Sequence, residues 1–150
     1  MNEIYSNIQT VTPGDLDDLT TFWRSIKGVG LGKGDDLESL ERFVRRNPTT
    51  CFLVRDDKRI IGSVLGGFDG RRGYVYHLAV IPEKRRQGLG RLLMDTVCRE
   101  LEQLGAHKIH LFVLNDNPDA IGFYQRLGWI RRTDIQVMSS DRSFLSASGD

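Results

Sequence analysis

Changes in the spacing of hydrophobic residues divide the chain into helices and strands. The segment DLDDLTTFWRSI, which follows Pro13, has the three-to-four-residue spacing of a helix. Its inward positions are Leu16, Leu19, Phe22 (or Trp23) and Ile26. A second helix is expected over residues 36–46, with Leu37, Leu40 and Val44 inward, and it ends before Pro48. Four glycines within residues 27–34 predict a mobile loop between these helices.

The middle of the chain has the pattern of three consecutive strands. CFLVRDDKRIIGSVLGG reads as two strands joined by a turn at residues 56–58, and YVYHLAVI follows the FDGRRG turn as the third. EIYSNIQTVT predicts a first strand and KIHLFVL a later one. WIRRTDIQVMSS predicts one or two final strands.

The longest helical pattern includes Leu89 and runs to Gly105, a typical C-terminal glycine. Its apolar stripe consists of Leu89, Leu92, Leu93, Val97, Leu101 and Leu104. A short helix, PDAIGFYQRL, is closed by Gly128. Strands that alternate with helices predict an α/β fold with a mixed central sheet flanked by about four helices. We expect residues 1–150 to form one domain.

The charged residues are unevenly distributed along the chain, although their total nearly cancels. Twenty-one Lys and Arg nearly balance twenty Asp and Glu, so the chain as a whole indicates neither a nucleic-acid partner nor a membrane partner. Between Gly14 and Glu41 there are seven acidic and three basic residues, whereas between Ile81 and Arg91 there are four basic and one acidic. The first region should prefer cations and the second anions, although a charge run is often only a solvated surface.

The two cysteines and the chain start indicate a cytoplasmic protein. Cys51 and Cys98 stand far apart inside apolar patterns, so we expect both to be reduced and in the core. The start, MNEIYSNIQTV, has no long apolar stretch, and no apolar run of 18 residues occurs elsewhere.

The RRQGLGR segment is the first candidate for chemistry. A helix N-terminus offers unpaired N–H groups, and glycine allows close approach of a bound group, so together they favour phosphate. Gly88 and Gly90 precede the long helix and are flanked by Arg85, Arg86 and Arg91. We predict that a pyrophosphate-like anion lies against the amides of residues 86–91. A turn that merely contains two glycines is the alternative.

Two common phosphate motifs do not fit this loop. A dinucleotide fingerprint needs a third glycine where Leu93 stands, and residues 83–87 separate the strand from Gly88. A Walker A loop needs Ser or Thr after Gly-Lys, but Gly34 follows Gly32–Lys33.

Two segments resemble motifs of the GNAT (GCN5-related) N-acetyltransferases. HLAVIPEKRRQGLGRLLM is similar to the acetyl-CoA motif, with Arg85, Gly88 and Gly90 at its defining positions. NPDAIGFYQRLGW is similar to a second motif, matched by Asn117, Ala120, Tyr124, Gly128 and Trp129. SVLGGFDGRRG followed by YVYHLAV further resembles the bacterial YpeA-type branch. The resemblance covers nearly the whole chain, and it also extends to ribosomal-protein alanine acetyltransferases.

The resemblance implies that acetyl-CoA is the co-substrate and that an amine attacks its thioester directly. The backbone of Leu78, Ala79 and Val80 would pair with the pantetheine arm, and the Val80 amide would polarise the thioester carbonyl. We expect the side chains of Leu78 and Val80 in the core. The pyrophosphate would lie against a loop formed by Arg85, Arg86, Gln87, Gly88, Leu89, Gly90 and Arg91. Asn117 would contact the cofactor or, alternatively, only cap the following helix.

The same resemblance gives Tyr124 the role of the acid that protonates the departing thiolate, since a phenol with pKa about 10 keeps its proton near neutral pH. A core aromatic is the alternative. No carboxylate occurs in YVYHLAV or KIHLFVL, and Phe112 stands where the ribosomal-protein enzymes carry glutamate. His77 is therefore the candidate general base, with a pKa near 6.5 and Tyr74 or Tyr76 ordering a water. A structural histidine is the alternative.

The remaining expectations concern ligands and partners. His107 and His110 lack the spacing of a zinc site, so no metal is expected. The acidic, glycine-rich region favours a cationic amine acceptor that a mobile loop could cover. The sequence allows a monomer or a homodimer. A non-catalytic acyl-CoA-binding or sensing module is the alternative function.

Overall fold

A computed structural model describes residues 7–145, so the first part of the expected N-terminal strand lies outside the described residues. The chain forms two compact units, residues 1–117 and 118–150. The first unit contains a five-stranded sheet in the order β1-β2-β3-β4-β5. The strands are β1 (Ile8–Thr10), β2 (Cys51–Asp56), β3 (Arg59–Phe68), β4 (Gly73–Val80) and β5 (Ile109–Leu111). Neighbouring strands are antiparallel except β4 and β5, which are parallel.

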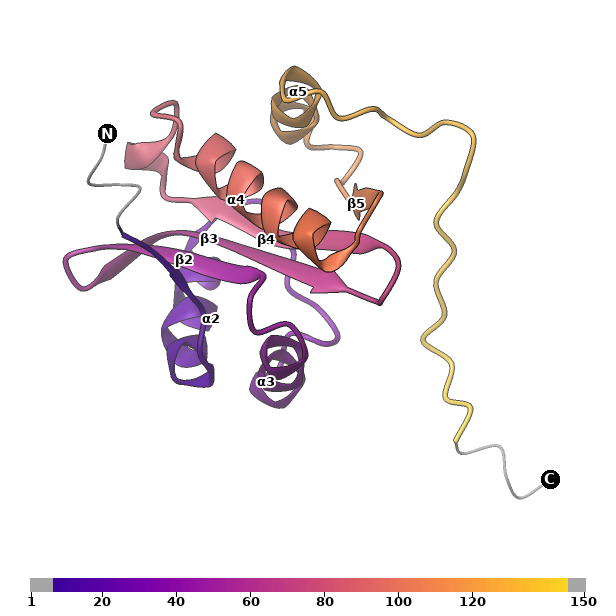
Figure 1. The fold of residues 1–150 in the computed structure, drawn as a ribbon, viewed down its shortest axis with the longest axis horizontal. Coiled ribbons are helices and arrows are strands. Elements are labelled where there is room, and N and C mark those ends of the chain that lie inside the picture. The colour runs from indigo at the N-terminus through magenta and orange to yellow at the C-terminus, as the bar shows by residue number, and fades with distance from the viewer. Residues whose placement is uncertain (1–6, 146–150) are drawn as a thin grey trace. The chain divides into compact units, whose positions relative to one another are not determined.

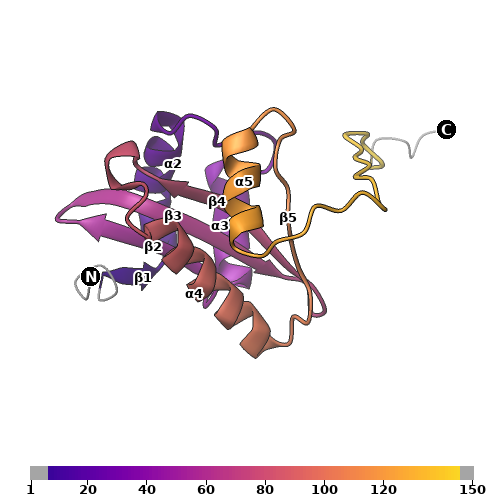
Figure 2. The same ribbon diagram turned by 90° about the horizontal axis from the view of Figure 1, so that it is seen from above.

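Helices cover both faces of this sheet. Helices α2 (Leu16–Ser25) and α3 (Leu37–Arg46) lie on one face, and α4 (Leu89–Leu104) lies on the other (Figures 1 and 2). Short 3-10 turns, η1 (Pro13–Asp15) and η2 (Pro82–Lys84), precede α2 and α4. The second unit contains α5 (Pro118–Arg126). A mixed five-stranded sheet with four helices confirms the predicted α/β fold class.

Glycines on β3 let α4 approach the sheet closely. A Cβ atom on Gly66 would lie 2.5 Å from Val97 Cγ2 and 2.8 Å from the Thr50 carbonyl oxygen, closer than atoms can pack. Four residues earlier on β3, a Cβ atom added to Gly62 would lie 3.2 Å from Leu89 Cδ2. This close packing fixes the N-terminal end of α4 beside the carboxyl end of β4.

Helix ends follow the predicted signals. Gly105 ends α4 at a φ of 112°, and the Ala106 amide donates to the Leu101 carbonyl oxygen at 3.0 Å. Gly128 has a φ of 94°, and the Trp129 amide donates to the Tyr124 carbonyl oxygen at 3.0 Å. Both glycines adopt the left-handed conformation that closes a helix.

Three expectations about packing are wrong. Leu37 is 47% exposed because it is the first residue of α3 and its side chain points back beyond the helix. Leu104 is also exposed, since the buried stripe of α4 consists of Leu89, Leu93, Met94, Val97 and Leu101. Cys51 is buried, but Cys98 is only half-buried; both are free thiols.

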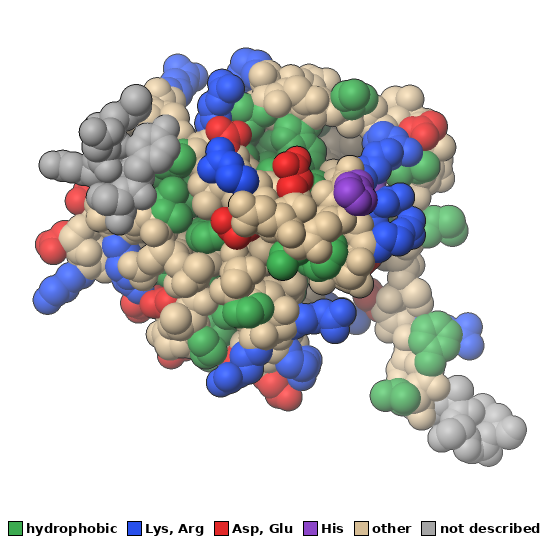
Figure 3. Space-filling view, in the orientation of Figure 1, with side chains coloured by type: hydrophobic (Ala, Val, Ile, Leu, Met, Phe, Trp, Pro, Cys, Tyr) green, Lys and Arg blue, Asp and Glu red, His purple; other side chains and the backbone are tan. Residues whose placement is uncertain are grey.

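The expected final strands are absent from the described part of the second unit. Residues 129–145 form neither helix nor strand, although their sequence has strand-forming residues. Several apolar side chains on this segment are exposed, among them Ile130, Val137, Met138, Phe144 and Leu145 (Figure 3). A strand needs a neighbouring strand for its N–H and C=O groups, and the local pattern does not encode that neighbour.

Candidate active site

The candidate site starts at an irregularity in β4. Ser63 pairs with Ala79 and Leu65 pairs with Tyr76, so two residues of β4, His77 and Leu78, lie opposite one residue of β3. This two-against-one register is a β-bulge. His77 has a φ of +51°, a left-handed conformation that is uncommon for a residue other than glycine.

Beyond the bulge, β4 extends past its pairing with β5. The parallel ladder contains three pairs, and the last one joins Val75 to Leu111. The Ile81 amide donates to the Ile61 carbonyl oxygen on β3 at 3.0 Å. Because backbone directions alternate along a strand, the N–H and C=O groups of Val80 point to the opposite side, where β5 no longer pairs. The Val80 carbonyl oxygen accepts a hydrogen bond from Arg85 Nε at 3.1 Å. This strand end can accept a further extended chain.

The loop after β4 leads to an uncapped helix N-terminus. Gly88 is the N-cap of α4 at a φ of +87°, and it has no side chain to bond the first-turn amides. The first helical bond joins the Leu92 amide to the Gly88 carbonyl oxygen at 3.0 Å. The amides of Leu89, Gly90 and Arg91 therefore have no carbonyl partner within the helix. The first turn contains no acidic residue, and a Cβ on Gly88 would meet nothing within 4 Å. These features fit a bound phosphate.

The side chains around this loop have different environments. Arg86 has a φ of +63°, so two residues near the N-terminus of α4 adopt left-handed backbone. Arg85, Arg86 and Gln87 are exposed, whereas Leu89 is buried and anchors the helix. Gln87 Nε2 donates to the Glu83 carbonyl oxygen at 3.2 Å. The side chains of Leu78 and Val80, expected in the core, are only half-buried.

His77 is held by three contacts that the sequence did not reveal. Ser63 Oγ donates to the His77 carbonyl oxygen at 2.9 Å, and Trp23 Nε1 donates to Ser63 Oγ at 2.8 Å. The Trp23 and His77 ring centroids are 4.7 Å apart. His77 Nε2 lies 2.7 Å from Asp35 Oδ1, and these side chains are only 14% and 18% exposed. Asp35 lies on a loop 42 positions from His77, so no local pattern in the strands indicates it.

The loop formed by residues 27–36 contacts two elements of the first unit. Asp35 joins it to β4, and Asp35 Oδ2 accepts the Gly32 amide at 2.8 Å. At the other end, a Cβ on Gly28 would lie 3.6 Å from Asn117 Nδ2, on the segment that follows β5. The loop therefore reaches both β4 and the residues after β5. Its mobility stays a prediction.

Tyr124 belongs to α5, in the second unit. Its ring makes edge contacts with Phe123 and Trp129, with centroids 5.2 Å and 6.2 Å away. Burial raises the pKa of Tyr124 to about 12, so the phenol stays protonated well above neutral pH. It retains a proton that it can donate.

Two further properties concern the described residues alone. Within residues 7–145, no group of three or more His, Cys, Asp or Glu side chains is placed to hold a metal ion. No helix in the same range is long and apolar enough to cross a membrane. Phe112, just beyond β5, is 60% exposed.

Comparison with known proteins places this arrangement in a family. The family model described as "Acetyltransferase (GNAT) family" matches residues 16–129. Acetyltransferase ECA0875 from Pectobacterium atrosepticum is 32% identical over 113 residues, which cover 75% of this chain and 79% of that protein. The chain belongs to the GNAT acetyltransferase family. Its members use acetyl-CoA, so this GNAT protein is an acetyltransferase whose acyl donor is acetyl-CoA.

Solved structures share the GNAT fold at low sequence identity. Naa20 from Chaetomium thermophilum, solved in complex with a bisubstrate analogue, has a TM-score of 0.69 and 23% identity, covering 80% of this chain and 68% of its own. The aminoglycoside 6'-N-acetyltransferase AAC(6')-IG from Acinetobacter haemolyticus has a TM-score of 0.68 and 15% identity, covering 91% and 99%. At such identities the likeness concerns the fold of this GNAT protein and not its acceptor.

Proposed function

We propose that this GNAT protein transfers the acetyl group of acetyl-CoA directly to a primary amine. The observation that carries the proposal is the combination of an uncapped N-terminus of α4 with a β4 end that lacks a pairing strand. The uncapped helix N-terminus can bind the pyrophosphate of CoA, and the unpaired end of β4 can pair with its pantetheine arm. Both features lie on one continuous segment, residues 76–91.

The cofactor contacts follow from this segment. The backbone of Leu78, Ala79 and Val80 pairs with the pantetheine arm, and the Val80 amide donates to the thioester carbonyl oxygen. The pyrophosphate accepts hydrogen bonds from the amides of residues 86–91, with Arg85, Arg86 and Arg91 as nearby positive charges. Asn117 contacts the cofactor from the segment after β5.

The proposed reaction has two proton transfers. The amine nitrogen attacks the thioester carbon, a C–N bond forms, and the C–S bond breaks to release the CoA thiolate. Tyr124 gives its proton to the thiolate, and its raised pKa keeps that proton available at neutral pH. His77 accepts the proton that the attacking amine loses.

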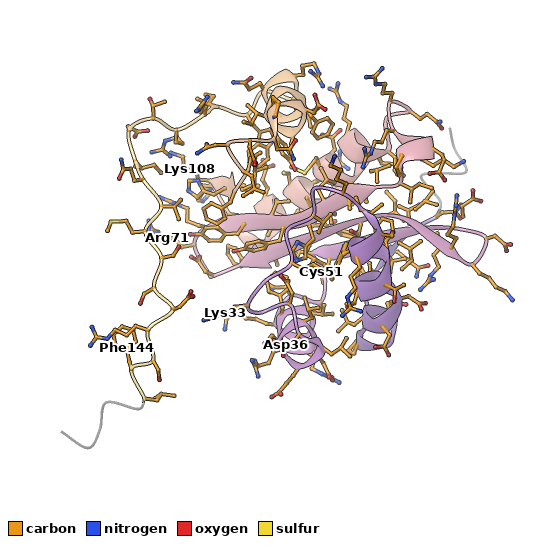
Figure 4. The ribbon with its side chains drawn as sticks, turned by 180° about the vertical axis from the view of Figure 1, so that it is seen from behind. Lys33, Asp36, Cys51, Arg71, Lys108 and Phe144 are labelled. Carbon is orange, nitrogen blue, oxygen red and sulfur yellow. The ribbon has the colours of Figure 1, made fainter. Side chains whose placement is uncertain are left out.

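The acceptor is a cationic amine. Asp36, which Figure 4 labels, is the N-cap of α3 and follows Asp35 in the sequence. The two carboxylates supply negative charge at the end of the loop that contacts β4. Fold similarity does not choose among acceptors, because Naa20 and an aminoglycoside acetyltransferase match about equally well. We further propose that residues 1–150 act as one GNAT domain, since the family match runs from 16 to 129.

Release of CoA thiol with a panel of amines tests this proposal. The panel contains peptides with free N-termini, peptides with an internal lysine, spermidine and an aminoglycoside. We expect release above the hydrolysis rate with at least one amine, and acetylation of that amine confirmed by its mass. Binding of acetyl-CoA without release for any amine would instead support the acyl-CoA-binding alternative. Absence of acetyl-CoA binding would contradict both functions.

A further inference from the structure

His77 occupies a backbone conformation that the surrounding structure must maintain. A φ of +51° in the middle of a strand is unfavourable for a residue with a Cβ. Such conformations persist where neighbouring contacts over-determine them, and they concentrate at functional sites. The residue lies immediately before the Leu78–Val80 backbone that we assign to the pantetheine arm.

The contacts of His77 determine its ring as well as its backbone. Ser63 is fully buried and bonds the His77 carbonyl oxygen, which fixes the backbone. The Trp23 ring, held through its own bond to Ser63, packs against the imidazole at a centroid distance of 4.7 Å. The remaining freedom of His77 is rotation of its imidazole ring. The contact between Nε2 and Asp35 Oδ1 fixes that rotation.

The Asp35 carboxylate can select one imidazole tautomer. An ionised carboxylate only accepts hydrogen bonds, so at 2.7 Å the neutral imidazole must donate its Nε2–H to Asp35 Oδ1. The lone pair then resides on Nδ1, the ring nitrogen that Asp35 does not contact. When the imidazole accepts a proton, the same carboxylate balances the positive charge in a half-buried setting.

We propose that Asp35 is a positioning residue that keeps Nδ1 of His77 available as the proton acceptor, which links the loop of residues 27–36 to the chemistry. This inference rests on the proposed function. It accounts for a general base in a chain that carries no carboxylate on β4 or β5. Both Asp35 oxygens are engaged, since Oδ2 accepts the Gly32 amide, so the loop and the imidazole are held by one group.

A structural ion pair alone would give different results, and the chain offers a matched control. Asp15 is 17% exposed and pairs with Arg55 at 3.2 Å, much as Asp35 is 18% exposed and pairs with His77. Asp15→Asn removes a carboxylate of similar burial that has no contact with His77. Asp35→Asn keeps the side-chain shape but can donate to Nε2, which places the imidazole hydrogen on Nδ1.

Two measurements on the full chain test the inference. Long-range proton–nitrogen NMR spectra of the imidazoles, with the His77 signals assigned through His77→Gln, report the tautomer. We expect the Nε2–H form in the wild type and in Asp15→Asn, and the Nδ1–H form or a mixture in Asp35→Asn. Steady-state kinetics with the best amine should show kcat reduced about 10- to 100-fold by Asp35→Asn, less than the roughly 100- to 10,000-fold that a general base itself contributes, because His77 is still present. The Kd for acetyl-CoA should stay within about twofold.

The outcomes separate this inference from the proposed function. An Nδ1–H tautomer in the wild type, or equal kcat values for Asp35→Asn and Asp15→Asn, would overturn the role of Asp35 while leaving acetyl transfer intact. A wild-type protein that binds acetyl-CoA but acetylates no amine would contradict the proposed function, and the tautomer would then decide by itself whether Asp35 positions His77. If the Kd for acetyl-CoA is unchanged in Asp35→Asn, the variant is folded, and a lower kcat is not caused by unfolding.

Discussion

Two loops in this chain contain left-handed glycines and lead into a helix, yet they leave the two helix N-termini in opposite chemical states. Residues 27–36 end at Asp36, whose Oδ2 accepts the Ser39 amide at 3.1 Å and caps α3. Residues 81–88 end at Gly88, which has no side chain, so the first amides of α4 stay open to an external anion. An acidic residue, Glu38, also lies in the first turn of α3, whereas the first turn of α4 contains none.

The comparison shows that glycine content alone does not define a phosphate site. Both loops contain left-handed glycines, namely Gly28 and Gly34 in the first and Gly88 in the second. In the loop before α4 the proposed functional groups are backbone amides. In the loop before α3 they are carboxylates, because Asp36 caps the helix and Asp35 contacts His77. The predicted anion site therefore belongs to the second loop only.

The largest effect is expected when α4 is given the cap that α3 has. Gly88→Asp places a carboxylate where it can accept the first-turn amides and repel a phosphate, and Asp tolerates left-handed backbone. Losing two charge-assisted hydrogen bonds should raise the Kd for acetyl-CoA by roughly 100-fold or more, as measured by calorimetry.

Gly88→Asn is the matched control because it has the same shape without the charge. We expect it to raise the Kd by about tenfold. Equal Kd values for the two variants would show that charge at this helix N-terminus does not govern binding.

A change outside both loops should alter the rate and leave cofactor binding intact. Tyr124→Phe removes the proposed acid, so kcat should fall about 100-fold while the Kd for acetyl-CoA stays within about twofold. A wild-type kcat in this variant would assign Tyr124 to packing alone.

The raised pKa of Tyr124 also predicts how stability and rate depend on pH. Burial raises it to about 12 in the folded chain, against an ordinary value of 10.0, so the phenol ionises first in the unfolded state. Stability should therefore decrease as pH rises above 10, and ionisation of Tyr124 should not lower kcat between pH 8 and 10. Thermal melts of the wild type and Tyr124→Phe between pH 10 and 12 measure the stability difference, and the wild-type kcat between pH 8 and 10 measures the effect on the rate.

The smallest effect is expected at the capped helix. Asp36→Ala removes the α3 cap and should lower the melting temperature by roughly 2–4 °C without changing the Kd for acetyl-CoA. Hydrogen bonds from Ser39 lower the pKa of Asp36, so its stabilising effect is complete above pH 3.8 and is lost as the pH falls below that value. The variant should therefore lose less stability than the wild type between pH 4 and 3.

Local signals allowed most of the fold to be predicted from sequence. Leucine spacing identified α4, and glycines marked its two ends at Gly88 and Gly105. These features depend on residues only a few positions apart. The final strands were predicted wrongly because a strand forms only against a partner, and residues 129–145 have the composition of strands without forming one.

The candidate site could be predicted only where it depends on the backbone of one segment. Residues 78–91 were predicted as the cofactor-binding segment because a strand, a basic loop with glycines and a helix follow one another in the sequence. The partners of His77 were not, since Asp35 is 42 positions away and Trp23 is on another helix. No spacing rule connects such residues, because the fold alone brings them together. The β-bulge that sets the φ of His77 was likewise invisible in the alternating pattern of β4.

Calorimetric titration of acetyl-CoA into Gly88→Trp and Gly34→Trp tests the central claim most directly. The two glycines have φ values of +87° and +90°, and neither has an atom within 4 Å of a built Cβ, so the substitutions impose matched strain and enter open space. We expect Gly88→Trp to abolish measurable binding and Gly34→Trp to bind like the wild type. Wild-type affinity in Gly88→Trp would contradict a pyrophosphate site at the N-terminus of α4.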